Sequence, residues 1–572
     1  MSAELVSRVY SNFRGVDFRG DEINILRSPD SLNVWKDYKE TESIRTRPAL
    51  ELDKTFKDAI YGIFFYDDTM LVHSGKTLYA INNGTTYTLY EGLNETVSNF
   101  FVYDDVVYFK DGKNYLKWKN AMTADPVVGY VPTTTIARKP TGGGTKYEDV
   151  NMMTPLRKNS FLADGVSFTY VLDVRNIDDD AVPLVYVNDE PVSQDKYTVD
   201  YAEGMIVFKN SPPAAPLTDG QDNVVIVFKK DVRQYREAIE KCTMVQVFDN
   251  RVFFSGNPEY PNMIWNSSLN DPCYVADLDY YKEGMDKAAV KGMVAGNNAL
   301  WVFREPSDAN ATIFYHTPAI DDEYGKIYPS SHSSITTGCI GKAVNFNDDI
   351  VFFSERGMEG ISGDVTTEQV VAHRSSLVDR KMTAEKDYKN MVLAEWEGYL
   401  LVCIGNKVYL ADSRAMFQNE NHYEYEWFMW QLEKDVISAT VKDGVLYIGT
   451  SDGIYTLKIT NENGKSYWET PTDTNVESYW VTPLDKFKYP HKLKTTNKRG
   501  CVAEATGDIS VYAKLEDTDF ELIGEYKGVT DYFVSRIKRK KFKDIQLKFH
   551  SNTRFSLETV TLECFIGGYI KR

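Results

Sequence analysis

The chain has 572 residues, a formal net charge of −18 at pH 7 and an aromatic content of 13%. This charge balance disfavours a tight nucleic-acid binder, because such affinity comes from Lys and Arg side chains that neutralise phosphates. No apolar run approaches the roughly 18 residues that cross a membrane, and the first residues lack the apolar core of a signal peptide. We therefore expect a large protein that is made in the cytoplasm and has no membrane-spanning segment.

Residues 1–55 form a polar, arginine-containing lead-in that does not follow the pattern of the rest of the chain. Five apolar side chains are the expected anchors of this lead-in onto the propeller described next: Phe13, Phe18, Ile25, Leu32 and Trp35. Arg45 and Arg47 carry positive charge that an acidic partner could pair with. We predict that these two arginines belong to a surface that docks another protein.

From residue 56 onward, a phrase recurs in which a short apolar run, a two-residue polar turn and a second apolar run follow one another. The turns are Asp67-Asp68, Asp104-Asp105, Asp249-Asn250, Asn297-Asn298, Asp348-Asp349, Glu397-Gly398 and Asp443-Gly444. Asp, Asn and Gly tolerate the left-handed backbone of tight hairpins. The last four phrases recur about every 50 residues, near the period of four-stranded blades. The sequence predicts an all-β protein with a six- or seven-bladed β-propeller over residues 56–130 and 231–460.

More than the length of one blade separates the second phrase from the third, which indicates a domain inserted into the propeller. Residues 131–149 are rich in Pro, Thr and Gly, and we predict an unfolded linker there. Five strand-like runs follow, which predict a small immunoglobulin-like β domain over residues 145–230. Residues 231–242 carry apolar side chains at helical spacing and are expected to lead the chain back into the propeller.

After a polar connection, the alternation of residues 476–572 predicts a C-terminal β-sandwich. A group of cations stands out there against the acidic background: Arg536, Lys538, Arg539, Lys540 and Lys541. Lys-rich segments protect the edges of sheets, but they also dock acidic partners. Both interpretations stay open, and these five residues are the main candidates for a docking site.

The sequence contains no H-E-x-x-H motif and no Gly-rich phosphate loop. His332 lies beside serines, but a catalytic triad joins residues that are distant in sequence, so we expect a loop histidine. Acidic pairs at hairpin tips are explained by turn geometry. The six cysteines stand singly, without the spacing of a zinc site, and are expected to be reduced and mostly buried. We predict no enzymatic activity, no metal and no other cofactor.

Residues Arg27–Leu52 resemble the opening of a family of phage virion proteins, in which an RS-x-x-x-x-N segment leads into a TRPG-L or TPG-L phrase. The matching residues are Asn33-Val34 and Thr46-Arg47-Pro48, with Ala49 where the family has Gly. This family comprises the packaged-DNA stabilisation, or tail nozzle, proteins of tailed phages. The inserted domain and the ending Phe555–Arg572 are also similar to β modules of such virion components.

The resemblance implies a structural subunit in the neck or tail of a virion, assembled as a ring that usually has six copies. Such a ring lies below the portal and adaptor proteins, continues the DNA channel and holds packaged DNA until infection. An excess of carboxylates fits this conduit, because the wall then repels sliding DNA instead of binding it.

Two alternatives stay open. One is a tail-tip or secreted glycan-binding propeller, which would use aromatic stretches such as Tyr423–Gln431 and Ser466–Pro471. The other is a propeller glycoside hydrolase, which would need two carboxylic acids that face each other across a sugar.

Overall fold

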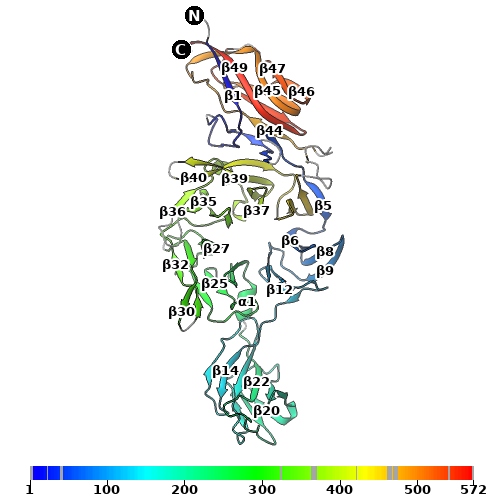
Figure 1. The fold of residues 1–572 in the computed structure, drawn as a ribbon, viewed down its shortest axis with the longest axis vertical. Helices are drawn as coiled ribbons and strands as arrows, with labels where there is room; N and C mark the ends of the chain where they lie inside the picture. The colour runs from blue at the N-terminus through cyan, green and yellow to red at the C-terminus, as the bar shows by residue number, and fades with distance from the viewer. Residues whose placement is uncertain are drawn as a thin grey trace. The chain divides into compact units, whose positions relative to one another are not determined.

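The computed structural model describes residues 4–21, 23–38, 43–232, 234–308, 310–322, 325–362, 370–419, 422–459, 467, 475–538 and 541–569. Helix is confined, within these residues, to α1 (Gln234–Glu240), α2 (Asp379–Met382) and the 3-10 turns η1 (Gln194–Lys196) and η2 (Tyr388–Asn390). The remaining regular structure is β-sheet, which confirms the predicted all-β class (Figure 1). The chain divides into two compact units, one of Met1–Gly75, Ala80–Thr85 and Thr337–Arg572, the other of Lys76–Tyr79 and Thr86–Thr336.

Seven four-stranded sheets follow one another through the described residues, in the manner of propeller blades. The first two consist of β6 (Ile60–Tyr66), β7 (Thr69–Ser74), β8 (Thr77–Asn82) and β9 (Thr85–Glu91), and of β10 (Asn99–Tyr103), β11 (Val106–Lys110), β12 (Tyr115–Trp118) and β13 (Asp125–Pro126). The next two consist of β23 (Met244–Phe248), β24 (Arg251–Ser255), β25 (Met263–Asn266) and β26 (Tyr280–Lys282), and of β27 (Val290–Gly296), β28 (Ala299–Arg304), β29 (Ile313–His316) and β32 (Ser330–His332).

The remaining three sheets come after residue 337. The first of them consists of β33 (Ala343–Phe346), β34 (Asp349–Ser354), β35 (Gly357–Ser362) and β36 (Val370–His373). The second consists of β37 (Val392–Trp396), β38 (Tyr399–Ile404), β39 (Lys407–Asn419) and β40 (His422–Gln431). The third contains β41 (Ser438–Lys442), β42 (Val445–Gly449), β43 (Gly453–Leu457) and a strand from the N-terminal segment that is described below. A small hairpin of β30 (Ala319–Asp321) and β31 (Gly325–Ile327) lies between β29 and β32 in the chain. The β-propeller that the repeated phrases predict is thus confirmed.

The hairpin turns within these sheets have the predicted left-handed geometry. The φ angle is 49° at Asp67, 51° and 58° at Asn297 and Asn298, and 51° and 77° at Asp443 and Gly444. Asp, Asn and Gly adopt such angles at little cost, and turns of this kind match the twist of the strands that they join. Turn geometry therefore accounts for the acidic side chains at these tips.

The last of the seven sheets is completed by a strand from the opposite end of the chain. β5 (Glu51–Thr55) pairs antiparallel with β43, so that Gly453 lies opposite Thr55 and Ile454 opposite Lys54. The end of the predicted lead-in therefore belongs to the propeller, and the boundary at residue 55 is wrong. The N-terminal segment and the final repeat are joined by hydrogen bonds across about 400 residues of sequence.

The C-terminal sandwich is one ten-stranded sheet to which the N-terminal segment contributes four strands. Its strands are β1 (Glu4–Tyr10), β2 (Ser31–Leu32), β3 (Val34–Lys36), β4 (Ile44–Thr46), β44 (Ser478–Val481), β45 (Lys492–Leu515), β46 (Glu521–Val529), β47 (Tyr532–Ser535), β48 (Ile545–Ser551) and β49 (Phe555–Tyr569). β1 runs antiparallel to β49, from Glu4 opposite Ile566 to Tyr10 opposite Val560 (Figure 1). The lead-in therefore supplies strands to this sheet, which the sequence analysis did not predict.

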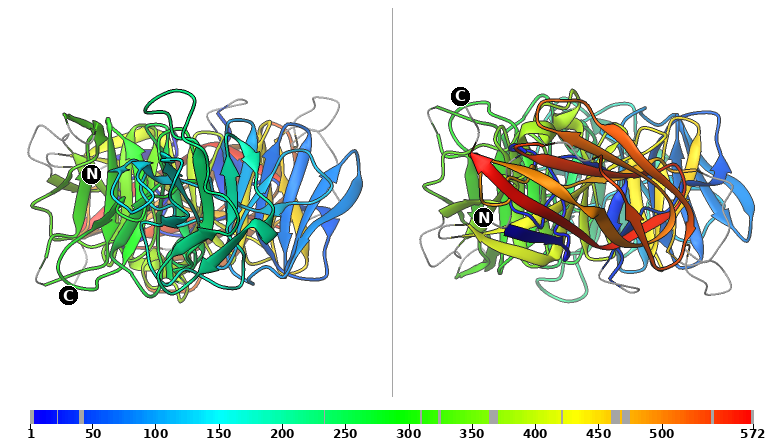
Figure 2. Two further views of the ribbon diagram at one scale, coloured as in Figure 1. Left: turned by 90° about the horizontal axis from the view of Figure 1, so that it is seen from below. Right: turned by 90° about the horizontal axis from the view of Figure 1, so that it is seen from above.

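The longest strand of the C-terminal sheet, β45, changes its partners midway along its length; the orange and red strands of this sheet are seen from above in the right-hand view of Figure 2. After residue 507, β45 pairs with β46 and β48, and before it with β47 and β49. At this change of partners, Gly507 has a φ of 102°, and a Cβ atom there would lie 2.2 Å from the carbonyl oxygen of Arg554. β45 thus runs through both halves of a single sheet.

Four of the five predicted anchors of the lead-in are buried or half-buried. Phe13 and Trp35 lie in the core of the C-terminal sheet, which also contains side chains of β37–β43, and Phe18 lies in a second core with side chains of β33–β40. Leu32 is half-buried. Ile25 is 38% exposed, so its prediction as an anchor is wrong.

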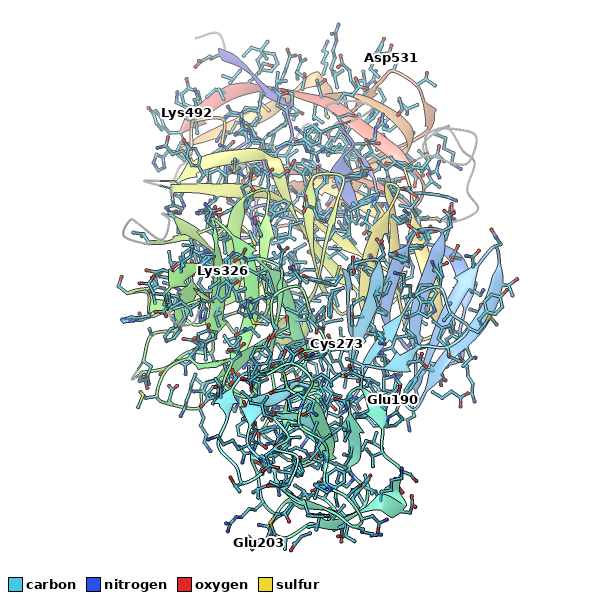
Figure 3. All side chains as sticks on the ribbon, turned by 60° about the horizontal axis from the view of Figure 1, so that its bottom comes forward. Glu190, Glu203, Cys273, Lys326, Lys492 and Asp531 are labelled. Atoms are coloured by element: carbon cyan, nitrogen blue, oxygen red, sulfur yellow. The ribbon has the colours of Figure 1, made fainter. Side chains whose placement is uncertain are left out.

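The inserted domain contains two sheets around its own core. The larger has β14 (Thr133–Arg138), β15 (Thr145–Lys146), β16 (Leu156–Phe161), β18 (Leu184–Val187), β19 (Glu190–Pro191) and β22 (Val224–Lys229), and the smaller has β17 (Thr169–Val171), β20 (Tyr197–Asp200) and β21 (Met205–Phe208). Glu190 and Glu203 mark this domain in Figure 3. The prediction of an unfolded linker over residues 131–149 is wrong, because β14 pairs in parallel with β16 and belongs to the larger sheet.

The base of the inserted domain is fastened to neighbouring sheets of its own unit. Asn151 forms a β-bridge with Ala276, and the backbone N–H of Met152 donates to the carbonyl of Val275 at 2.8 Å. Met152 and Met153 share a core with Ile239 of α1, the helix that the sequence predicts after the insertion. The boundary predicted at residue 145 therefore assigns Met152 and Met153 to the inserted domain, although both pack in a core with strands of the propeller.

Candidate functional site

The basic segment predicted as a docking site lies between β47 and β48. Arg536, Lys538 and Lys541 are exposed, whereas Ile537 and Phe542 are 7% and 1% exposed and belong to the core of the C-terminal sheet. Arg539 and Lys540 lie outside the described residues. Two buried side chains thus hold the segment at both ends and leave the three described cations on the surface.

The backbone around this segment is fixed by a buried lysine. Phe542 and Lys494 exchange backbone hydrogen bonds of 2.8 and 3.1 Å. The Lys494 ammonium group donates to the carbonyl oxygens of Tyr489 and Lys543, and burial lowers its pKa. At the other end, a Cβ atom on Gly500 would lie 2.3 Å from the carbonyl oxygen of Ser535, so only glycine permits this close approach. The cations therefore project from a rigid support.

A pocket of about 250 Å³ opens beside the basic segment. Its lining combines apolar side chains, two carboxylates and the three cations: Ala513, Leu515, Glu516, Thr518, Glu521, Leu522, Ile523, Arg536, Ile537, Lys538, Lys541 and Phe542. In the described part of the chain, the three cations form no ion pair with a carboxylate. Exposed cations beside apolar side chains, in a chain of net charge −18, are well suited to contact another protein.

Arg45 and Arg47 do not belong to this surface, and the prediction that they dock a partner is wrong. They are 5% and 1% exposed. The Arg47 guanidinium donates to the Asn33 side chain, to the carbonyl oxygens of Pro48 and Gln431, and to the Glu433 carboxylate, at 2.8–2.9 Å. Burial lowers the pKa of Arg47. Its charge is satisfied inside the protein and serves the fold.

The other residues of the motif within Arg27–Leu52 are also structural. Asn33 has a φ of 56°, donates to the carbonyl oxygen of Glu477 at 2.8 Å, and accepts from the backbone N–H of Gln431 at 2.8 Å. Arg27 makes a two-bond contact with the buried carboxylate of Glu426, at 2.7 and 2.8 Å. The motif therefore fastens the N-terminal segment to β40 and to the start of the C-terminal sheet.

The candidate catalytic and sugar-binding features have structural roles or lie on the surface. His332 is exposed on β32, a strand and not the predicted loop. Trp427 and Trp430 of the stretch Tyr423–Gln431 are fully buried, so they cannot stack on a sugar. Of residues 466–471, only Tyr467 lies among the described residues, and it is buried. The described residues contain no group of three or more His, Cys, Asp or Glu side chains suited to a metal ion.

The cysteines are mostly buried, as the sequence predicts. The six cysteines all lie among the described residues and form no disulfide there; five of them are buried and Cys273 is partly exposed. Within the described part of the chain, no helix has the length and apolar character needed to cross a bilayer.

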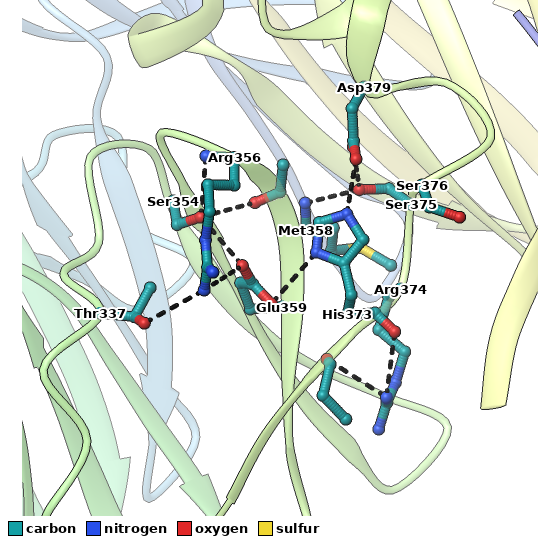
Figure 4. Close-up of polar contacts among 12 residues, drawn as sticks. Thr337, Ser354, Arg356, Met358, Glu359, His373, Arg374, Ser375, Ser376 and Asp379 are labelled. Atoms are coloured by element: carbon teal, nitrogen blue, oxygen red, sulfur yellow. Dashed lines mark hydrogen bonds and ion pairs between the residues drawn. The ribbon is translucent and has the colours of Figure 1, made fainter. Parts of the chain in front are cut away.

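One polar cluster was not predicted from the sequence. His373 at the end of β36 contacts two carboxylates, with Nε2 at 2.5 Å from Asp379 and Nδ1 at 3.2 Å from Glu359 (Figure 4). Ser375 donates to the far oxygen of Asp379 at 2.6 Å, and Arg356 contacts Glu359 at 3.0 Å. Burial by itself would lower the pKa of His373, but its hydrogen bonds to the two carboxylates raise the pKa to about 10.

This cluster holds three elements together by ion pairs. Both ring nitrogens of His373 are occupied by carboxylates, so neither is available to accept a proton from a nucleophile. The ion pairs of His373 join β35, β36 and α2. Glu359 of β35 lies directly opposite His373 of β36 in the strand register, and Asp379 is the first residue of α2. That register is the only signal that could have revealed the pair, and it appears only once the strands are known.

Comparisons with known proteins give no family. No family model and no curated protein matches the sequence. Among solved structures, the computationally designed Ika8 protein matches at 10% identity and a TM-score of 0.32, over 72% of this chain and 100% of its own. BamB from Moraxella catarrhalis matches at 13% identity and a TM-score of 0.31, over 72% of this chain and 97% of its own. A streptogramin B lyase matches at 12% identity and a TM-score of 0.26, over 72% of this chain and 98% of its own. These scores are too low to bear on function.

Proposed function

We propose that the protein is a non-enzymatic structural subunit of a tailed-phage virion. Copies of it form a ring in the neck or tail that extends the portal channel and retains or conducts packaged DNA. The observation that carries the proposal is the basic pocket, whose exposed cations have no described internal partner in a strongly acidic chain. Such a surface favours association with an acidic neighbour, either another copy or a portal or adaptor protein.

The residues that carry the family resemblance support the same proposal. Asn33 and Arg47 are buried and hold the N-terminal segment in place through hydrogen bonds to β40 and its surroundings. A motif with this role is expected in proteins that share a fold, whether or not they share a catalytic site. The burial of Trp427, Phe428 and Trp430 on β40 weighs against the glycan-binding alternative, for which Tyr423 at the start of the stretch is the exposed aromatic side chain.

The charge of the molecule suits a passive conduit. A net charge of −18 gives a surface that repels phosphate, so DNA can slide without forming contacts that must then be broken one at a time. We therefore expect the basic pocket to contact protein, and the affinity for free DNA to stay weak at physiological salt.

The test combines oligomer measurement, electron microscopy and DNA binding. The unmodified protein, alone and with portal and adaptor proteins, is expected to form rings, and the variant Lys538→Glu/Lys541→Glu is expected to lose them with an unchanged melting temperature. The matched control is Lys386→Glu/Lys389→Glu, which reverses two exposed lysines elsewhere. Tight DNA binding by the unmodified protein that the pocket variant loses, or turnover of a polysaccharide, would contradict the proposal.

A further inference from the structure

Strand β1 forms an edge of the C-terminal sheet. Within the described residues it pairs with β49 alone, in an unbroken antiparallel register from Glu4 opposite Ile566 to Tyr10 opposite Val560 (Figure 1). No strand in this part of the chain pairs with its other edge. The backbone N–H and C=O groups along such an edge are a template on which a further strand can pair.

The inward face of β1 holds the strand in place. Arg8 donates to Asp485 through Nε at 2.5 Å and through Nη2 at 3.1 Å, and the Tyr10 hydroxyl donates to the same carboxylate at 2.9 Å. Val6 packs against the core of the C-terminal sheet. A partner that pairs with β1 would therefore meet a strand that is already ordered, which lowers the entropic cost of association.

The outward face of β1 carries an uncharged and mainly apolar row. Leu5 and Val9 are 49% and 48% exposed, and the exposed Ser7 lies between them. Side chains at alternate positions of a strand point to the same face, so these three form one row. Phe565, directly opposite Leu5 on β49, is 36% exposed beside it. The row has no charge with which to attract a phosphate backbone, so a protein strand is the ligand that fits it.

The edge of β1 lacks the features that protect edge strands. Natural sheets keep other chains from pairing at an edge with lysine, proline, a bulge or a very short strand. Residues 4–10 contain no lysine and no proline, and the register of β1 with β49 has no shift. In the inserted domain, by contrast, the edge strand β19 has two residues and ends at Pro191. A seven-residue edge without such protection points to a partner strand.

We infer that β1 of one copy pairs antiparallel with β1 of a second copy, about a two-fold axis at Ser7. In this register Leu5 lies opposite Val9 of the second copy, so the exposed apolar side chains cover one another. On the inward face, Glu4 comes diagonal to Arg8 of the second copy, so that opposite charges approach each other. The two C-terminal sheets then continue as one.

Other registers of the two β1 strands fit less well. A shift by one residue would set the exposed row of one copy on the face opposite to that of the other. A shift by two residues in one direction would place Arg8 opposite Arg8 of the second copy. The same shift in the other direction would place Leu5 opposite Ser7 and carry Val9 beyond Glu4 of the second copy. The register centred on Ser7 is therefore the one that the sequence of β1 supports.

This contact differs in symmetry from the one that builds a ring. A two-fold contact uses the same patch on both copies, whereas a ring needs two different patches on each copy. The inference therefore goes beyond the proposed function and does not rest on it.

Cysteines placed along the outward row test the register in the full chain. Opposite Cα atoms of an antiparallel pair lie about 4.5–5.5 Å apart, within the roughly 4.4–6.8 Å that a disulfide spans. Ser7→Cys is therefore expected to form a covalent dimer in a mildly oxidising buffer. Leu5→Cys and Val9→Cys are each expected to stay uncrosslinked alone, because equal residues lie about 13 Å apart along the strands, and to crosslink when mixed. The unmodified chain, which has six cysteines of its own, gives the background.

Sedimentation equilibrium gives a second measurement. It uses the Lys538→Glu/Lys541→Glu variant, so that ring formation does not mask pairing, and this variant is expected to form a dimer. Adding Val9→Lys, which places a lysine on the edge, is expected to weaken the dimer at least tenfold. Leu217→Lys, at an exposed leucine of the inserted domain, is the matched control and is expected to change nothing. Thermal melting verifies that each variant is folded.

Three results would overturn the inference. They are a monomer at all concentrations, a folded Ser7→Cys variant that does not crosslink, and a Leu5→Cys variant that crosslinks alone as readily as Ser7→Cys. A dimer that tolerates Val9→Lys would also overturn it, because the contact would then lie elsewhere. Each of these outcomes leaves the proposed ring untouched, whereas a Ser7→Cys crosslink in a chain that forms no ring would contradict the proposed function alone.

Discussion

At the scale of single residues, the buried charges of this protein are held by several partners each. His373 is the clearest case for a measurement, because Glu359 and Asp379 raise its pKa to about 10. In an unfolded chain the pKa of histidine is about 6.5. Between these two values the folded state binds more protons than the unfolded state, so stability falls as pH rises. The contribution of His373 is complete below about pH 6.5 and is lost as pH passes through 10.

The first prediction follows from this fall in stability with rising pH. His373→Gln is expected to lower the free energy of unfolding of its unit by about 2 kcal/mol at pH 6, because two carboxylates lose a shared cation. The deficit should narrow steadily between pH 6.5 and 9.5. Denaturant unfolding at several pH values measures it, and His332→Gln on the exposed strand β32 is the control, for which no pH-dependent deficit is expected. A deficit that stays constant with pH would show that His373 is uncharged in the folded protein.

Arg47 gives a second prediction at this scale. Its guanidinium makes four hydrogen bonds, which the single ammonium of lysine cannot reproduce in the same geometry. Arg47→Lys is expected to cost about 3 kcal/mol, because buried acceptors are left unsatisfied. Thermal melting measures the change. Arg536→Lys, on the exposed rim of the pocket, should stay within about 0.5 kcal/mol, and an equal loss in both variants would contradict the structural role of Arg47.

At the scale of elements, the path of β45 where it changes partners depends on one glycine. Gly507 has a φ of 102°, and any side chain there would meet the carbonyl oxygen of Arg554. Gly507→Ala is therefore expected to cost more than about 3 kcal/mol, from the backbone angle together with the clash. Gly528 has a φ of 61°, and a Cβ atom added there would meet nothing within 4 Å, so Gly528→Ala isolates the angle alone and should cost about 1 kcal/mol. Equal melting temperatures for the two variants would show that β45 tolerates a side chain at residue 507.

The elements also show what the sequence could predict and what it could not. Pairs such as Asn297-Asn298 and Asp443-Gly444 carry a local signal, because their preferred backbone angles are those of the turn itself. The pairing of β1 with β49 has no local signal, since its partners lie at opposite ends of the chain. Arg47 was misplaced for a related reason: arginine is usually a surface residue, and its burial follows from contacts with Asn33 and Gln431 that only the fold creates.

At the scale of the whole chain, the two ends are held together by strand pairing. β1 and β4 pair with β49, β2 pairs with β44, and β5 pairs with β43. The first unit can therefore be completed only after the C-terminal strands have been made. These pairings also bury side chains of the N-terminal segment in a core shared with the C-terminal sheet. The C-terminal sheet should consequently stay bound even when its covalent connection to the propeller is cut.

The last prediction tests this directly. A protease site inserted between residues 468 and 471, outside the described residues, allows the purified protein to be cleaved after folding. The C-terminal fragment is expected to co-elute with the remainder in gel filtration without denaturant, because the N-terminal strands hydrogen-bond to it and share its core. Deleting residues 1–10 removes β1 and exposes the edge of β49, so the cleaved fragment should then dissociate at a lower denaturant concentration. If the fragments separate in native buffer while residues 1–10 are present, the C-terminal sheet is held by its covalent connection and not by its pairing with the N-terminal strands.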